Sequence, residues 1–179
     1  IDASPSATEN PIPDAEGEYY GFEPIGNSDT PFTGGYDGGG FAVNGLVVNR
    51  SSEDFAGLFG RIEYGSVENI GLRNISVIGK SYVGGVVGWN GQNTNINKVH
   101  AQGIVSADLS YAGGLIGINF GVISKSYADT SVTADIVGSF DGAGGLVGAN
   151  IGVISESFAF GTVISNNEGT SILSSYLAK

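Results

Sequence analysis

Histidine and cysteine are so scarce that they limit the chemistry open to this chain. The 179 residues include one histidine, His100, and no cysteine. No serine, carboxylate or second histidine stands near His100 in a pattern that would indicate a nucleophilic triad or a metal site. We therefore expect no catalytic residue, no metal ligand and no cofactor. His100 is predicted to occupy a solvent-facing position on a strand.

Carboxylates are the other groups with possible chemistry, because polysaccharide lyases and glycoside hydrolases use clustered acids or calcium. The acids between residues 101 and 160, within the repeats, do not recur at equivalent positions: Asp108, Asp129, Asp135, Asp141 and Glu156. Their expected role is that of solvated surface groups, with an active site assembled across several segments as the alternative. The segment YDGGG at 36–40 resembles a calcium loop only loosely, and Asp37 before glycines is typical of a turn.

The net charge of −11 is concentrated at the start of the chain. Residues 1–54 hold ten acids and one base, Arg50. This region would repel a polyanion, so neither nucleic acid nor an anionic membrane is expected as a partner. No run of about 18 apolar residues is present, so we expect no membrane insertion in this segment.

A four-residue motif, Gly followed by two hydrophobic residues and Gly, returns at nearly constant spacing. Its copies are GLFG at 57–60, GVVG at 85–88, GLIG at 114–117 and GLVG at 145–148, which start 28, 29 and 31 residues apart. A fixed period in this range is typical of stacked, solenoid-type folds. Function in such folds spreads over a surface, so columns of equivalent residues are the features to search for.

The repeats favour strands over helices. Glycine makes up 31 of the 179 residues, β-branched residues are abundant, and the apolar runs are only four to six residues long. A repeat of 28 to 31 residues accommodates three strands and three turns, which is one coil of a parallel β-helix. Equivalent residues of successive coils would then stack about 4.8 Å apart. The predicted fold is therefore all-β, a parallel β-helix with one coil per repeat.

Four aligned segments that follow the motif predict which side chains enter the core. They read VENIGL at 67–72, INKVHA at 96–101, ISKSYA at 123–128 and ISESFA at 154–159. Positions one, four and six are predicted to face inward, because strict alternation would bury the charged third position without a partner. A bend or bulge after position one is therefore expected. Position five then forms an external column of Gly71, His100, Tyr127 and Phe158.

The motif itself supplies two neighbouring apolar columns, which alternation places on opposite faces of one strand. The predicted inner column is Leu58, Val86, Leu115 and Leu146. The predicted outer column is Phe59, Val87, Ile116 and Val147, flanked by Trp89 and Ile118. A contiguous exposed apolar stripe more often marks a contact surface than bare solvent exposure, so the outer column is a candidate binding site. Tyr127 and Phe158 are added to it as aromatic residues on which a sugar or partner would stack.

Residues 111–128 and 144–159 carry the clearest copies of a longer pattern, Y-[VA]-G-G-[VL]-[VI]-G-x-N followed by G-x-I-S-x-S-[YF]-A. This pattern resembles the GLUG-motif repeats of bacterial exported proteins, and residues 21–50 resemble the segment that commonly precedes them. The resemblance covers about residues 19–163. It implies a right-handed β-helix with a stalk or adhesive role, as in surface adhesins and beside the catalytic part of IgA-cleaving metalloproteases. The protease motif H-E-x-x-H is absent.

The turns show where this chain departs from the repeat. Its second motif has an expanded turn, Gly91 to Asn95, and its third carries an insertion between Asp135 and Asp141, so both are expected to bulge from the coil. An Asn recurs after three of the four motifs, at Asn90, Asn119 and Asn150, where the first repeat has Ile62. Stacked Asn side chains are expected to hydrogen-bond from coil to coil.

Together these patterns predict one domain with a short arm. Residues 1–18 are expected to form an acidic, Pro- and Ser-rich N-terminal arm, 19–54 the entry cap and first coil, and 55–179 the GLUG-type repeats and C-terminal end of a single β-solenoid. The chain is interpreted as a non-catalytic structural and adhesive module of a bacterial cell-surface or secreted protein. A protein, a glycan or a second copy of the chain is the expected partner. The alternatives are a carbohydrate-active β-helix enzyme and a self-assembling filament subunit.

Overall fold

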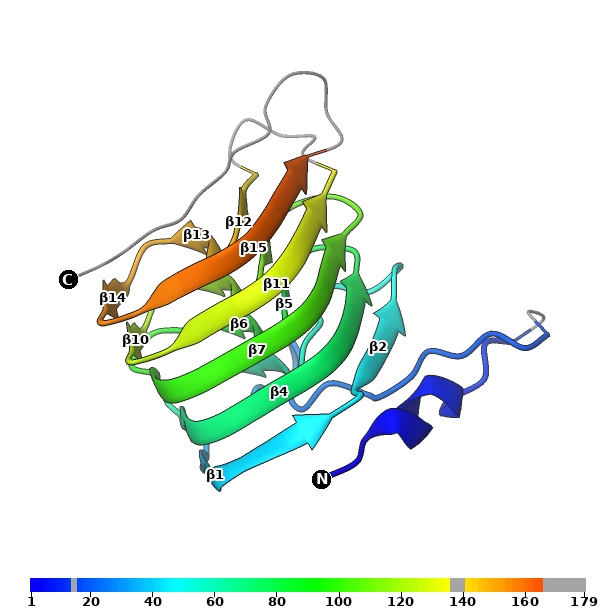
Figure 1. Ribbon diagram of the computed structural model, residues 1–179, viewed down its shortest axis with the longest axis horizontal. Coiled ribbons are helices and arrows are strands. Elements are labelled where there is room, and N and C mark those ends of the chain that lie inside the picture. Colours follow the sequence, from blue (N-terminus) through cyan, green and yellow to red (C-terminus); the bar gives the residue numbers. More distant parts are fainter. Residues whose placement is uncertain (14–15, 136–140, 166–179) are drawn as a thin grey trace.

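The computed structural model describes residues 1–13, 16–135 and 141–165, and almost all of its regular structure is β. Strands of successive repeats pair in parallel and in register, so the chain winds into a β-solenoid (Figure 1). The prediction of an all-β parallel β-helix is confirmed. Among the described residues the one helical element is η1, a 3₁₀ helix at Ser4–Thr8.

An eight-stranded sheet, here named the large sheet, forms one broad wall of the solenoid (Figure 1). Its strands are β1 (Gly35–Asn44), β2 (Val47–Arg50), β4 (Ser66–Gly79), β7 (Asn95–Ala107), β10 (Val122–Ser124), β11 (Tyr127–Ala134), β14 (Val153–Ser155) and β15 (Phe158–Ser165). β4 and β7 are long and curved, whereas the next two coils divide the same path between β10 and β11 and between β14 and β15.

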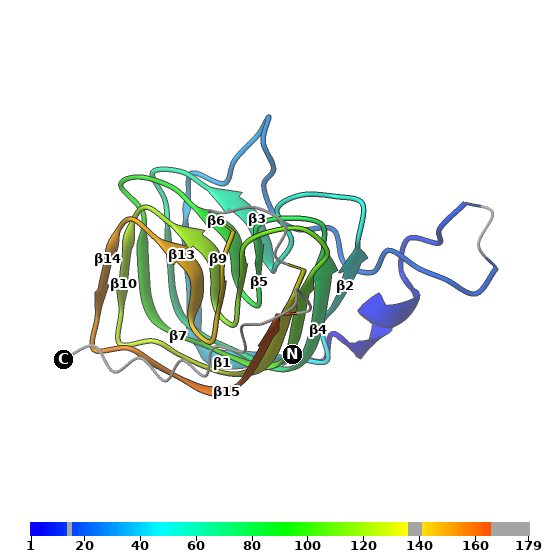
Figure 2. The same ribbon diagram turned by 90° about the horizontal axis from the view of Figure 1, so that it is seen from above.

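Two small parallel sheets lie opposite the large sheet (Figure 2). One contains β5 (Val83–Gly84), β8 (Ala112–Gly113) and β12 (Ala143–Gly144). The other contains β3 (Phe59–Ile62), β6 (Val87–Asn90), β9 (Ile116–Asn119) and β13 (Val147–Asn150). We number the coils 1 to 4 after β3, β6, β9 and β13.

The two small sheets are the legs of an arch that folds into the solenoid. The first leg is β5 or its equivalent, the second leg is β6 or its equivalent, and the tip between them is a Gly-hydrophobic pair such as Gly85 and Val86, both buried. The legs approach so closely that a side chain at Gly84 would run into Val87 O, and one at Gly113 into Ile116 O. Glycine is therefore required on the faces where the legs meet.

The arch tip reaches the inner face of the large sheet. A Cβ at Gly85 would lie 3.0 Å from Ala101 Cβ, and one at Gly114 would lie 3.0 Å from Ala128 Cβ. This close approach explains why β7 and β11 carry alanine at these inward positions.

The large sheet confirms the predicted inward positions and the bend between them. Position four is buried in all four aligned segments: Ile70, Val99, Ser126 and Ser157. Position six is buried in all four as well: Leu72, Ala101, Ala128 and Ala159. The third position, charged in three of the four segments, adopts left-handed backbone, with φ of 54°, 53°, 51° and 46° at Asn69, Lys98, Lys125 and Glu156. This local reversal keeps their side chains out of the core.

The prediction that the Phe59 column faces solvent is wrong. Phe59, Val87 and Ile116 are 0% exposed, Ile118 is 5% exposed and Val147 is half-buried. The Leu58 column is buried too, with Val86 and Leu115 at 0%. The physical reason is the arch: the chain turns at the tip between the two columns, and both outer faces of the arch lie inside the coil. Alternation holds along one extended strand and does not extend across such a turn.

An asparagine ladder runs through the turn after the second leg. Asn90 Nδ2 donates to Asn119 Oδ1 at 2.7 Å, and Asn119 Nδ2 donates to Asn150 Oδ1 at 2.7 Å. The predicted Asn column is therefore confirmed. Asn90 Oδ1 is buried and accepts no hydrogen bond in the described part of the chain, because coil 1 offers Ile62 in place of a donor.

The N-terminal residues contact the first coil. Ile1 N donates to Ala42 O at 2.8 Å, and Asp2 forms a parallel bridge with Asn44 of β1. Ser6 Oγ accepts a hydrogen bond from Val47 N at 2.9 Å. The division at residue 18 stays a prediction. The insertion predicted between Asp135 and Asp141 falls on residues 136–140, outside the described residues.

Candidate binding surfaces

The outer face of the large sheet carries the predicted external column as a stack of rings, here named the sheet stack. His100 and Tyr127 lie 4.9 Å apart between ring centroids with planes inclined by 1°, and Tyr127 and Phe158 lie 5.3 Å apart at 6°. Strict parallel register between β7, β11 and β15 places these side chains one above another. The column is confirmed, although Gly71 at its lower end has no ring.

His100 lies directly over Gly71, where any side chain would run into the imidazole. Its Nε2 atom is buried and has no hydrogen-bond partner among the described residues. Burial, and to a smaller extent the positive charge of Arg73, lowers the pKa of His100 below its usual value of 6.5. The imidazole is therefore neutral near pH 7, as expected for a packed member of the stack.

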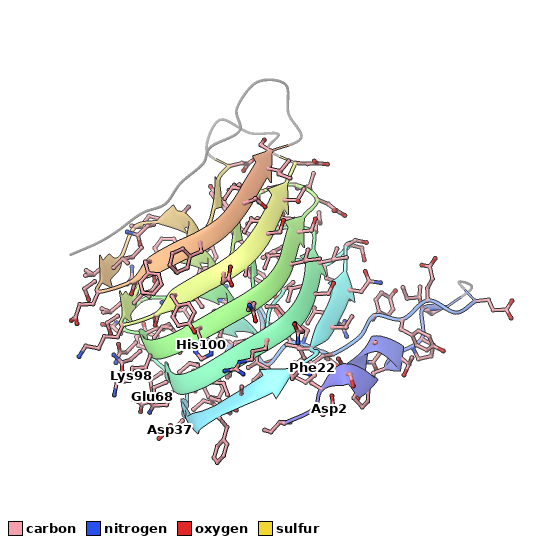
Figure 3. All side chains as sticks on the ribbon, viewed as in Figure 1. Asp2, Phe22, Asp37, Glu68, Lys98 and His100 are labelled. Atoms are coloured by element: carbon pink, nitrogen blue, oxygen red, sulfur yellow. The ribbon has the colours of Figure 1, made fainter. Side chains whose placement is uncertain are left out.

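A pocket of about 220 Å³ opens below His100, lined by Gly40, Phe41, Asn69, Ile70, Gly71, Lys98 and His100. Figure 3 shows Asp37, Glu68, Lys98 and His100 at the same end of β1, β4 and β7. Asp37 Oδ1 accepts hydrogen bonds from Gly39 N at 2.8 Å and Asn69 Nδ2 at 3.0 Å, which lower the pKa of Asp37 below 3.8. The first is the bond of a local turn, and the second joins β4 to β1. The described residues contain no group of three or more His, Cys, Asp or Glu side chains that could hold a metal.

A second aromatic group, here named the arch cluster, lies at the open end of the arch. Phe55, Tyr82 and Tyr111 precede the first leg in coils 1 to 3 and stack at 5.1 and 5.5 Å. Trp89, on the second leg, meets Tyr82 edge to face at 5.2 Å and stacks on Phe120 at 4.8 Å. These rings bridge the outer ends of the two legs. Burial raises the pKa of Tyr82 above its usual value of 10, with smaller contributions from Tyr111, Asp54 and Asp141.

Arg61 connects the arch cluster to the turn of coil 1. Its guanidinium carbon lies 5.2 Å from the centroid of Trp89 and 5.9 Å from that of Phe55, within the range of cation–π attraction. Glu63 Oε1 accepts hydrogen bonds from Arg61 Nη2 at 2.9 Å and from Nε at 3.3 Å. The pair is charge-neutral and partly buried, with side chains 28% and 19% exposed.

The turns of coils 1 and 2 enclose a pocket beside the arch cluster. Its volume is about 170 Å³, and it is lined by Glu63, Tyr64, Trp89, Gly91, Gln92 and Phe120. Gly91 and Gln92 belong to the expanded turn predicted at Gly91 to Asn95. Tyr64 N donates to Gln92 O at 3.3 Å, which joins the two turns. We name this feature the turn pocket.

The structure divides the predicted binding residues between the core and two surfaces. Phe59, Val87, Ile116 and Ile118 are buried in the core and Val147 is half-buried. Tyr127 and Phe158 come together in the sheet stack, whereas Trp89 belongs to the arch cluster. Sequence reasoning missed Phe55, Tyr82, Tyr111 and Phe120. The sequence pattern that could have indicated three of them is an aromatic residue at the same place before the arch glycines in coils 1 to 3.

Comparison with known proteins finds short stretches of similarity to much longer chains. No protein-family model and no solved structure matches. The chain is 43% identical to Halomucin of Haloquadratum walsbyi over 99 aligned residues. This stretch covers 54% of this chain and 1% of Halomucin. It is 42% identical to a putative Gly-rich membrane protein of Evansella cellulosilytica over 53 aligned residues. This stretch covers 29% of this chain and 6% of that protein. The chain thus corresponds to a small fraction of either relative.

The fold and these relatives fit a structural module of a surface protein. Neither relative is named as an enzyme, and one is named as a membrane protein. The described residues include no helix with the length and hydropathy that crossing a membrane requires.

Proposed function

We propose that this β-solenoid is an adhesive module that holds a surface or secreted protein to a partner, and that its repeats are of the GLUG type. The observation that supports adhesion most directly is the pair of aromatic groups on the outside of the coil, the sheet stack and the arch cluster. Aromatic side chains that are partly exposed and fixed by their neighbours provide contact area at a low entropic cost. The core needs neither group, since it is filled by the arch and the inward columns.

Beads that carry the purified chain test adhesion. Attachment would be measured on surfaces coated with neutral polysaccharide, acidic polysaccharide or the chain itself, against beads blocked with albumin. We expect attachment to at least one of these surfaces above the blocked beads. Attachment equal to that of blocked beads on all three would contradict an adhesive role and leave a scaffold.

Self-association is a second candidate, because β15 pairs with β11 alone among the described strands and carries exposed apolar residues. Phe160 is 63% exposed and Ile164 is 48% exposed. Edge strands and apolar patches promote association between copies. Sedimentation velocity over a hundredfold range of concentration would detect it. A constant monomer would exclude a filament, whereas growth that Phe160→Ser and Ile164→Thr abolish together would support one.

A further inference from the structure

We propose that the turn pocket binds one neutral sugar ring of a glycan. This inference rests on the proposed adhesive function and assigns that function a site and a ligand class. The turn pocket combines aromatic walls with a small set of polar groups, the combination that defines small-molecule sites in general. Its volume of about 170 Å³ leaves space for about one ring, since a cavity of about 150 Å³ holds one benzene molecule.

Tyr64 supplies the aromatic surface that a sugar ring would contact. The residue is 69% exposed, and its backbone is held at φ 54°. Trp89 is less available, because it lies between Arg61 of coil 1 and Phe120 of coil 3. Trp89 and Phe120 therefore form the apolar wall of the pocket, and Tyr64 offers the free ring.

Glu63 and Gln92 supply the polar groups. Arg61 donates to Glu63 Oε1 alone, so Oε2 accepts no hydrogen bond within the described part of the chain. A side chain at Gly91 would run into Glu63 Oε2, which places this free acceptor beside the pocket wall. Gln92 is exposed, and its amide offers two donors and an acceptor. Sugar hydroxyls both donate and accept, and they match this set.

The charges of the turn pocket select a neutral ligand. Arg61 and Glu63 neutralise each other, and the lining contains no further charged side chain. An anionic sugar would face Glu63 Oε2 and a chain of net charge −11. A quaternary ammonium ion would meet no unbalanced negative charge, because Arg61 neutralises Glu63, and the cation position over Trp89 is already taken by Arg61.

Trp89 is the one tryptophan of the chain and lines the turn pocket, so its fluorescence reports ligand entry. The probes are methyl glucoside, methyl galactoside, methyl mannoside and N-acetylglucosamine, each titrated through the millimolar range expected for a single ring. Glucuronate and tetramethylammonium are the charged comparison ligands. We expect a saturable change with at least one neutral sugar and a weaker response to both charged ligands.

Tyr64→Asn removes the ring and keeps a residue that tolerates left-handed backbone. We expect it to weaken sugar binding by about tenfold, with an unchanged circular dichroism spectrum. Gln92→Ala should weaken binding by at least a few fold, because it removes hydrogen bonds to the sugar. Phe41→Ala, the matched control at an aromatic residue of β1 that is 70% exposed, should leave sugar binding unchanged.

The inference fails if no neutral sugar gives a saturable change, if a charged ligand binds as tightly, or if Tyr64→Asn binds like the parent. Bead attachment separates this failure from that of the proposed function. Beads that attach while free sugars give no response would retain adhesion and reject the turn pocket. Sugar binding without any bead attachment would retain the pocket and reject adhesion.

Discussion

The turn after the second leg is long in coils 1 and 2 and short in coils 3 and 4. Four residues lie between Asn90 and Asn95 in coil 2, whereas two lie between Asn119 and Val122, the equivalent positions of coil 3. The short turn closes around Asn119, which bonds Gly121 N at 3.2 Å and Gly121 O at 3.3 Å. The long turns instead diverge from the coil and enclose the turn pocket.

This difference separates the parts of the repeat that build the scaffold from the parts that make a site. Where equivalent residues recur without a break, they form closed columns: the apolar core, the Asn ladder and the sheet stack. Where the repeat is interrupted, space opens beside the column. The turn pocket follows from the long turns, and the pocket below His100 follows from the missing ring at Gly71. Candidate sites in such a solenoid are therefore best sought at interruptions.

A cavity at the arch tip should produce the largest loss of stability. Leu115 is 0% exposed and lies at the tip in coil 3. We expect Leu115→Ala to cost about 2–5 kcal/mol of unfolding free energy, measured by urea denaturation. The control is Lys125→Ala at an exposed left-handed position, expected to cost less than about 0.5 kcal/mol. Equal midpoints for the two variants would mean that the arch tip is not part of the core.

Substitutions in the Asn ladder should produce the next largest loss of stability, and the loss should be greater at Asn119 than at Asn150. Asn119 is 0% exposed and bonds two coils and its own turn. We expect Asn119→Ala to cost about 1–3 kcal/mol, because buried partners lose their hydrogen bonds. Asn150 is exposed, and water can replace its side chain, so Asn150→Ala should cost less than about 1 kcal/mol. Urea denaturation of both variants makes the comparison, and equal losses would contradict the role of the ladder in the interior.

The regular columns could be predicted from sequence because register carries each residue to the same place in every coil. The bend at Lys98 and its equivalents followed from the cost of burying a charge, and the sheet stack followed from the bend. The outward prediction for Val87 failed because the repeat length fixes the period of the coil and not its path. A segment that folds inward as an arch and one that runs along the outside as a strand repeat at the same interval, so the interval does not distinguish them.

The arch cluster and the turn pocket could not be predicted for the same reason. Tyr82 and Trp89 are seven positions apart, and they meet because the arch brings its two legs together. The expanded turn at Gly91 was visible in the sequence, but its neighbours Glu63 and Phe120 come from other coils. Only the three-dimensional register assembles these residues.

Shortening the turn of coil 2 converts an interrupted coil into a regular one. Deletion of Gln92 and Asn93 leaves two residues between Asn90 and Asn95, the length found in coil 3. We expect a change in unfolding free energy of less than about 1 kcal/mol, because surface turns tolerate changes of length. The shortened turn no longer forms the turn pocket, so the response of Trp89 to sugars should be abolished. A large loss of stability would show that the long turn supports the fold, and the division between scaffold and site would fail in coil 2.

The smallest effect is expected at the second interruption, where the sheet stack ends on Gly71. The pKa of His100 is lowered in the folded chain, so the unfolded chain binds the proton first as the pH falls through about 6.5. Stability is therefore expected to decrease as the pH falls from about 7.5 to 5, by a small amount that His100→Phe removes.

Phe fits the same column as Phe158 and does not titrate, while Arg73 and Lys98 stay in place. Urea midpoints of both proteins at both pH values isolate the imidazole, because the acids titrate alike in the two. The difference in urea midpoint between the parent and His100→Phe should therefore change with pH. A constant difference would mean that folding does not shift the pKa of His100, and that packing over Gly71 does not hold the imidazole neutral.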